Sequence, residues 1–125
     1  MGAAATGQLF AASMVSGTLT LAAANTPYNL LTLIQAQLDP NCPGAGYEVN
    51  IQADSTGPVY VGRPNPVVGA LSTSNYGYVL DKAQSGFVGG SARTYRSSFP
   101  GSHSPIGDLW VMGTAANTTI HVEVM

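Results

Sequence analysis

Tyr47-Glu-Val-Asn-Ile-Gln-Ala-Asp54 and Thr118-Thr-Ile-His-Val-Glu-Val124 are the two stretches of the sequence that decide the fold. In both, apolar and polar side chains alternate, which is the period of a β-strand with one buried face. The alternation predicts the inward-facing residues of the first strand to be Tyr47, Val49, Ile51 and Ala53. In the second strand it predicts Ile120, Val122 and Val124 to face inward, and His121 and Glu123 to face outward.

Shorter predicted strands flank these two, and of them Gly17–Ala22 also alternates. They are Gly17–Ala22, Pro58–Gly62, Tyr76–Leu80, Gly86–Val88 and Asp108–Gly113. Short strands at about ten-residue spacing, separated by Gly and Pro turns, predict an all-β domain, either a β-sandwich or a jelly roll. We expect Ala115-Ala-Asn117 to form a hairpin turn between the last two strands, and Gly89–Pro105 to form a long loop.

One segment departs from the strand pattern and predicts a short helix over residues 27–38. Thr26 can cap its N-terminus, and Pro27 suits the first helical position. Asp39-Pro40 ends it, because the residue before a proline is pushed out of the α region. Its apolar side chains fall on one broad face that we expect to cover one end of a sheet or to lie at a subunit contact. These side chains are Leu30, Leu31, Leu33, Ile34 and Leu38.

The chain is unusually poor in charge. Of its 125 residues, 4 are basic and 6 are acidic, and the first charged side chain is that of Asp39. An average soluble domain is about 25% charged. Such a surface repels its neighbours weakly and tends to associate, so we expect much of it to be covered by copies of the chain or by a partner. The alternative is a neutral monomer with a Ser/Thr-rich β surface.

The composition also excludes several classes of function. No apolar run approaches the ~20 residues of a membrane-spanning helix. A net charge of −2 gives no general affinity for nucleic acid or for anionic membranes. The length fits one domain, which we place at residues 17–125 after an N-terminal arm or edge strand at residues 1–16. Because the N-terminus lacks a basic secretory signal, we expect the chain to be made in a cytoplasm.

The sequence offers little with which to build an active site. The sequence contains the residue types of a hydrolytic triad in His103, Ser102, Ser104 and Asp108. Nothing around them predicts the strand–turn–helix elbow that exposes a nucleophilic serine. The single Cys42 lies in a turn-rich stretch and forms neither a disulfide nor a metal framework. The carboxylates are scattered, and no glycine-rich run opens a helix to hold phosphates. We therefore expect no catalytic residues, no metal and no cofactor.

One local concentration of charge remains. Arg93 and Arg96 are two of the chain's four basic residues, and they lie beside Tyr95 and Phe99. Arg and Tyr are frequent interface anchors, because each buries a large area while offering directed hydrogen bonds. The segment is therefore interpreted either as a contact loop for an acidic partner surface or a carboxylate-bearing ligand, or as a solvated loop.

Several apolar motifs carry a resemblance to a known group of proteins. They are Pro58-Val-Tyr-Val-Gly62, Ser72-Thr-Ser-Asn-Tyr-Gly-Tyr-Val-Leu80, Asp108-Leu-Trp-Val-Met-Gly-Thr114 and Ile120-His-Val-Glu-Val124, with the earlier Leu30-Leu-Thr-Leu-Ile34. Together they resemble small virion proteins of tailed bacteriophages. The resemblance covers roughly residues 17–124 and leaves out the segment with Arg93 and Arg96.

The resemblance implies a non-enzymatic structural protein of the capsid surface. Such a protein decorates or cements the shell as an oligomer, often a trimer, on the major capsid protein or another virion protein. The uncharged N-terminal arm, with Leu9 and Phe10 as its contacts, would extend over a neighbour. A tail, connector or fibre component remains an alternative within the virion.

A different alternative is a carbohydrate-binding β-sandwich used in host adhesion. In that case exposed aromatic side chains would stack on sugars. The candidates are Trp110, Tyr60, Tyr76, Tyr78 and Tyr95.

Overall fold

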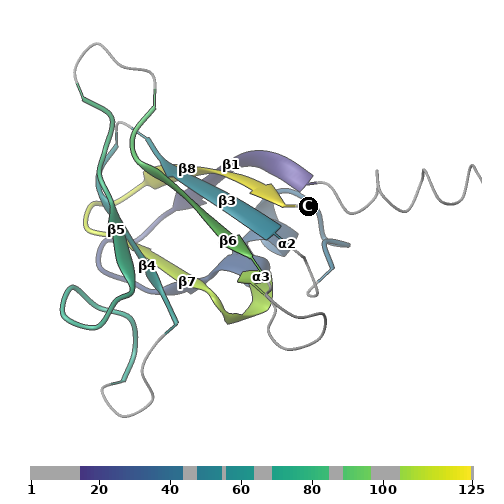
Figure 1. Ribbon diagram of the computed structural model, residues 1–125, viewed down its shortest axis with the longest axis horizontal. Helices are drawn as coiled ribbons and strands as arrows, with labels where there is room; N and C mark the ends of the chain where they lie inside the picture. Colours follow the sequence, from purple (N-terminus) through teal and green to yellow (C-terminus); the bar gives the residue numbers. More distant parts are fainter. Residues whose placement is uncertain are drawn as a thin grey trace, which may run out of the picture.

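A computed structural model of the protein describes residues 15–43, 48–54, 56–63, 69–84, 89–96 and 105–124. These residues form two four-stranded antiparallel sheets that face each other (Figure 1). In strand order, the first sheet contains β1 (Val15–Leu21), β8 (Thr118–Val124), β3 (Glu48–Ala53) and β6 (Ala92–Arg96). The second contains β2 (Tyr28–Asn29), β7 (Trp110–Gly113), β4 (Val59–Gly62) and β5 (Tyr78–Leu80). The all-β prediction is confirmed.

The order of pairing is that of a jelly roll. Strand β1 pairs with β8, β2 with β7, β3 with β6, and β4 with β5. The chain is thus folded back on itself as one long antiparallel hairpin, which is then wrapped into two sheets. The pairings β3–β8 and β4–β7 join the hairpin's successive segments within each sheet. Edge strands β5 and β6 belong to different sheets and are consecutive along the chain.

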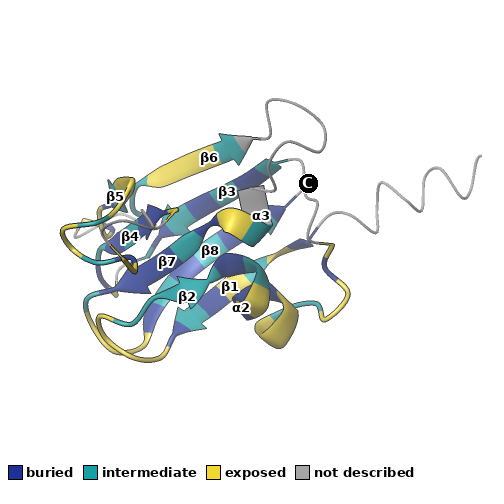
Figure 2. Ribbon diagram, turned by 90° about the horizontal axis from the view of Figure 1, so that it is seen from below, coloured by how far each residue is buried: buried dark blue, intermediate teal, exposed yellow. Residues whose placement is uncertain are grey.

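The core lies between the sheets, and the alternation of side chains predicts it correctly. Val49, Ile51 and Ala53 of β3 are buried, as are the three inward-facing residues of β8. One cluster joins these side chains to those of β1 and β4 and to Leu30, Leu33 and Ile34 of the helix. Helices α2 (Leu30–Gln37) and α3 (Pro105–Asp108) contact each other at one end of the sandwich (Figure 2).

Helix α2 is shorter at its N-terminus than the sequence predicts. Tyr28 of β2 pairs with Val111 of β7, so the backbone stays extended through Asn29. Asn29 has φ −70° and ψ 128°. Asn29 is therefore the N-cap, and its Oδ1 accepts a bond from the amide of Thr32 at 3.1 Å. Capping by Thr26 was the wrong prediction, because sheet pairing holds the two residues before the helix.

The predicted loop over Gly89–Pro105 is also wrong in part. Residues 92–96 form β6, which pairs with β3 along its whole length, and residues 105–108 form α3. Thr94 and Tyr95 favour strands, and an edge strand tolerates the polar residues that surround them.

The predicted hairpin at Ala115-Ala-Asn117 is wrong as well. Strands β7 and β8 lie in different sheets, so this turn carries the chain from one sheet to the other. Asn117 adopts φ 58°, and its amide donates to the carbonyl of Ala22 at 3.1 Å.

Several sequence predictions concern residues outside those that the structure describes. These residues are Tyr47, the strand Gly86–Val88, His103 and, among the predicted interface residues, Leu9, Phe10 and Phe99. Strand β1 begins at Val15 and thus includes the last two residues of the predicted arm.

Candidate functional site

Edge strands β5 and β6 bring an arginine and two tyrosines together at the open side of the sandwich. Arg93 and Tyr95 lie opposite Ile51 and Val49 in the register of β6 with β3, and these two partners are fully buried. Arg93 and Tyr95 therefore sit at inward-facing positions of the first sheet. Tyr78 lies opposite a buried valine of β4, so it sits at an inward-facing position of the second sheet.

Stacking on the two tyrosines holds the guanidinium of Arg93. Its Cζ lies 4.4 Å from the centroid of the Tyr78 ring and 5.4 Å from that of Tyr95. Cation–π contacts at exposed sites contribute about 0.5–1 kcal/mol each. An inward-pointing charge on an edge strand also discourages an apolar strand from adding to that edge. Arg93 therefore orders the open side of the sandwich and keeps β6 from pairing indiscriminately.

Burial raises the pKa of the Tyr95 hydroxyl above its ordinary value. The positive charge of Arg93 and a hydrogen bond to it lower the pKa, but they compensate only in part. Arg63 lowers the same pKa, so its charge is also felt at this hydroxyl. The Tyr95 hydroxyl thus stays protonated at neutral pH and remains a hydrogen-bond donor beside two arginines.

These side chains line a cavity of about 310 Å³. The described residues of its wall are Gly62, Arg63, Gly77, Tyr78, Arg93, Tyr95 and Leu109. Two glycines in this wall let β4 and β5 approach closely, because a Cβ on Gly62 would lie 2.6 Å from the backbone nitrogen of Gly77. Two of the chain's four basic residues, the exposed Arg63 and Arg93, contribute to this wall, and no carboxylate is found among its described residues.

The interface residues predicted from the sequence lie in different places in the structure. It places Arg93 and Tyr95 in one cavity, whereas Arg96 ends β6 opposite Glu48 in the register. Sequence reasoning missed Arg63 as the second arginine. Arg63 directly follows β4, and only the pairing of β4 with β5 shows that this position lies near Tyr78. No signal in the sequence indicates that β4 pairs with β5 across the residues that separate them.

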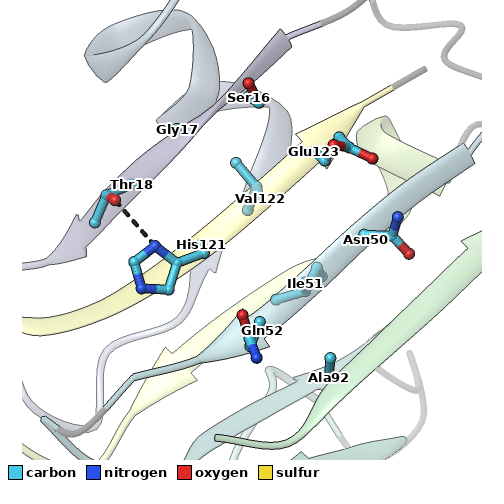
Figure 3. Close-up of a pocket in the computed structure, with 10 residues that line it drawn as sticks. All are labelled: Ser16, Gly17, Thr18, Asn50, Ile51, Gln52, Ala92, His121, Val122 and Glu123. Carbon is cyan, nitrogen blue, oxygen red and sulfur yellow. Dashed lines mark hydrogen bonds between the residues drawn. The ribbon is translucent and has the colours of Figure 1, made fainter. Parts of the chain in front are cut away.

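The outer face of the first sheet forms a second depression, of about 440 Å³ (Figure 3). Residues from all four strands line it, mainly Ser, Thr, Asn, Gln and Ala, together with Glu123 and His121 of β8. His121 is its central ring, and Thr18 bonds to Nδ1 at 3.1 Å across the strands. Asp54 bonds to Nε2 at 2.9 Å. The prediction that His121 faces outward is confirmed, and the structure adds two partners that hold its ring.

The remaining aromatic candidates are distributed between the sheet surface and its interior. Tyr76 and Tyr78 are exposed, and Tyr76 contacts Tyr60 edge to face with ring centroids 4.9 Å apart. Trp110 is half-buried in β7. Cys42 is buried, and burial, together with the charge of Asp39, raises the pKa of its thiol. A buried thiol with a raised pKa is a poor nucleophile.

The described residues hold no gathering of three His, Cys, Asp or Glu side chains of the kind that binds a metal. Neither α2 nor α3 is long and apolar enough to cross a membrane, and these are the helices of the described part of the chain.

Comparisons with protein-family models, with curated protein sequences and with solved structures gave no match to this chain.

Proposed function

We propose that the protein is a non-enzymatic structural subunit of a tailed-phage particle, which decorates or cements the capsid shell as an oligomer. A trimer is favoured by the resemblance of its apolar motifs to small virion proteins. The observation that carries the proposal furthest is the outer face of the first sheet. Strands β1, β8, β3 and β6 present there a broad surface of mostly short polar side chains, with Glu123 and His121 in its middle.

Such a face is suited to a contact with another protein. Ser16, Thr18, Asn50 and Gln52 can exchange hydrogen bonds with a partner, whose own donors would have to compensate the carboxylate of Glu123 on the same face. The register places Glu123 of β8 between Ser16 and Asn50, and His121 of β8 between Thr18 and Gln52, so the rows form a continuous surface across β1, β8 and β3. A solvated sheet face of this size would ordinarily carry several lysines, which repel other chains.

The fold and the composition support the same proposal. The jelly roll is an architecture of viral capsid proteins and also of lectins, so the fold alone does not select between them. The low charge content favours a subunit of an assembly. A subunit surrounded by neighbours gains more stability from contact area than from screened surface ion pairs.

The mass of the protein in solution, measured by light scattering at low and moderate salt, tests this proposal. We expect a discrete closed oligomer that co-sediments with phage shells lacking it. Ser16→Lys and Ala92→Lys place bulky charges on the outer face of the first sheet without removing a described side-chain hydrogen bond, and we expect both to weaken assembly. Ala36→Lys adds the same charge on the exposed side of α2 and serves as the control.

A monomer at all concentrations that also fails to bind shells would contradict the proposal. Equal assembly of Ser16→Lys, Ala92→Lys and Ala36→Lys would show that another surface makes the contact. Binding to isolated tails in place of shells would assign the protein to the tail.

A further inference from the structure

The wall of the cavity between β5 and β6 carries two positive charges, and among the described residues only one of them has a contact that explains its place in the fold. Arg93 stacks on two tyrosines, whereas Arg63 contributes a second cation to the same wall. The ion pair between His121 and Asp54 lies on the other face of the first sheet. Two cations that share a cavity without a carboxylate in its described wall raise the affinity of that cavity for an anion.

The geometry of Arg93 favours a carboxylate as that anion. Its Cζ lies over the Tyr78 ring, and the guanidinium carries five N–H donors in a planar fork, so its hydrogen bond to the Tyr95 hydroxyl leaves further donors for a ligand. A planar fork of donors matches the two oxygens of a carboxylate. Because stacking already fixes the side chain, binding costs little further side-chain entropy.

The rest of the wall is suited to a ring-shaped ligand. Tyr78, Tyr95 and Leu109 provide apolar surface, and the Tyr95 hydroxyl adds a hydrogen-bond donor. A volume of about 310 Å³ lies at the lower end of the ~300–1,000 Å³ of small-ligand sites, enough for one carboxylated sugar ring and too little for an oligosaccharide. A sugar ring has apolar C–H faces and polar edges, which correspond to the two kinds of surface present.

We propose that this cavity binds one acidic sugar unit, a uronic or sialic acid, with Arg63 and Arg93 holding its carboxylate and the tyrosines contacting its ring. An extended segment of a partner protein is less suited to the place. It would have to add to the edge of β6, where the inward-pointing Arg93 opposes an apolar strand.

The test is a titration of the full-length protein, followed by amide chemical shifts in NMR, with glucuronic acid and N-acetylneuraminic acid. The methyl ester of glucuronic acid keeps the ring and removes the charge, and acetate keeps the charge and removes the ring. We expect both acids to bind in the millimolar range, shifting amides of β5 and β6, and the ester and acetate to bind at least roughly tenfold more weakly.

Variants assign the binding to the cavity. Arg93→Lys keeps the charge but loses the planar fork, and Arg63→Gln removes the second cation; we expect each to weaken binding roughly tenfold or more. Lys82→Gln removes one positive charge from an exposed position outside this wall and should bind as the wild type does. The spectrum of each free variant reports whether its fold is retained.

Three results would overturn the proposal. The first is a folded wild-type protein that binds neither acid, and the second is acetate binding as tightly as glucuronic acid. The third is acid binding that Arg93→Lys and Arg63→Gln leave unchanged. If these two variants alter the oligomeric mass and not the sugar titration, the arginines contact protein and the sugar site is refuted. The proposal does not depend on the shell function, whose test uses a different face of the molecule.

Discussion

Gln37, at the end of α2, bonds both backbone groups of Thr20 and so closes part of the free edge of β1. The amide of Thr20 donates to Oε1 of Gln37 at 2.8 Å, and Nε2 of Gln37 donates to the carbonyl of Thr20 at 2.9 Å. The neighbouring Leu38 covers Gly17 so closely that a Cβ there would lie 2.6 Å from Cδ2 of the leucine. The side-chain amide thus substitutes for a neighbouring strand at an edge that would otherwise invite pairing.

Replacing Gln37 should destabilise the fold and promote association through β1. Two hydrogen bonds at a partly solvated edge contribute about 0.5–1 kcal/mol each, so Gln37→Ala should lower the free energy of unfolding by about 1–2 kcal/mol. Gln37→Glu keeps an acceptor for the amide of Thr20 but has no donor for its carbonyl, and it should lose less. Urea denaturation measures both, and equal stability of all three proteins would show that the edge contact contributes nothing.

The start of α2 gives a second prediction that separates the structure from the sequence pattern. Asn29 accepts from the amide of Thr32, and its Nδ2 donates to the carbonyl of Gly107 at 3.0 Å, which ties α3 to α2. Asn29→Ala should therefore cost about 1–2 kcal/mol of unfolding free energy. Thr26→Ala removes the cap that the sequence suggests and should cost less than about 0.5 kcal/mol. Thermal or urea denaturation compares them, and the reverse order would contradict the assignment of the cap.

Strand positions were predictable because burial imposes a period of two on the sequence, and β3 and β8 display it without interruption. Strand β6 was missed because an edge strand with one arginine facing inward has no such pattern. The choice between a β-sandwich and a jelly roll stayed open for a different reason. Of the strands that the structure describes, only β4 and β5 are partners and also consecutive along the chain. The hydrogen bond between Thr18 and His121 joins residues 103 positions apart, a distance over which local patterns carry no information.

The same reason explains what could be predicted of the candidate site. Arg93 and Tyr95 are close in sequence and attracted notice as a local concentration of charge and aromatic side chains. Arg63 and Tyr78 come from other strands, and they reach the cavity only through the pairing of β4 with β5 and the packing of the two sheets.

The raised pKa of Tyr95 leads us to expect a loss of stability at high pH. Burial raises its pKa in the folded state above the ordinary value of 10.0, so folding favours the protonated hydroxyl. This contribution is fully present below the pKa of the unfolded chain and is lost as the pH rises through the pKa of the folded state. The free energy of unfolding should therefore fall above about pH 10, and it should fall less steeply in Tyr95→Phe.

Urea denaturation at several pH values between about 9 and 11 measures this slope. Tyr60→Phe removes an ionisable hydroxyl that lies outside the described wall of the cavity, and it serves as the control. Parallel slopes for the wild type and Tyr95→Phe would show that the Tyr95 hydroxyl is not responsible.

The N-terminal residues provide the last prediction, because the structure fixes where a truncation should end. Val15 begins β1 and pairs with Val124, and it is buried in the core. A chain without residues 1–14 retains all of β1 and should unfold at nearly the same urea concentration as the full protein. A chain without residues 1–17 loses Val15 and its part of the ladder, and we expect it to be less stable by about 1–3 kcal/mol.

If the first residues act as an arm over a neighbour, the shorter truncation should weaken assembly without weakening the fold. Its mass by light scattering should then fall towards that of the monomer, and its binding to shells should decrease. Because Gln37 already occupies the backbone groups of Thr20, an arm from a neighbour cannot pair with β1 at that residue and has to find another surface. Assembly and shell binding equal to those of the full chain would show that the contacts between subunits are made by the β-domain alone.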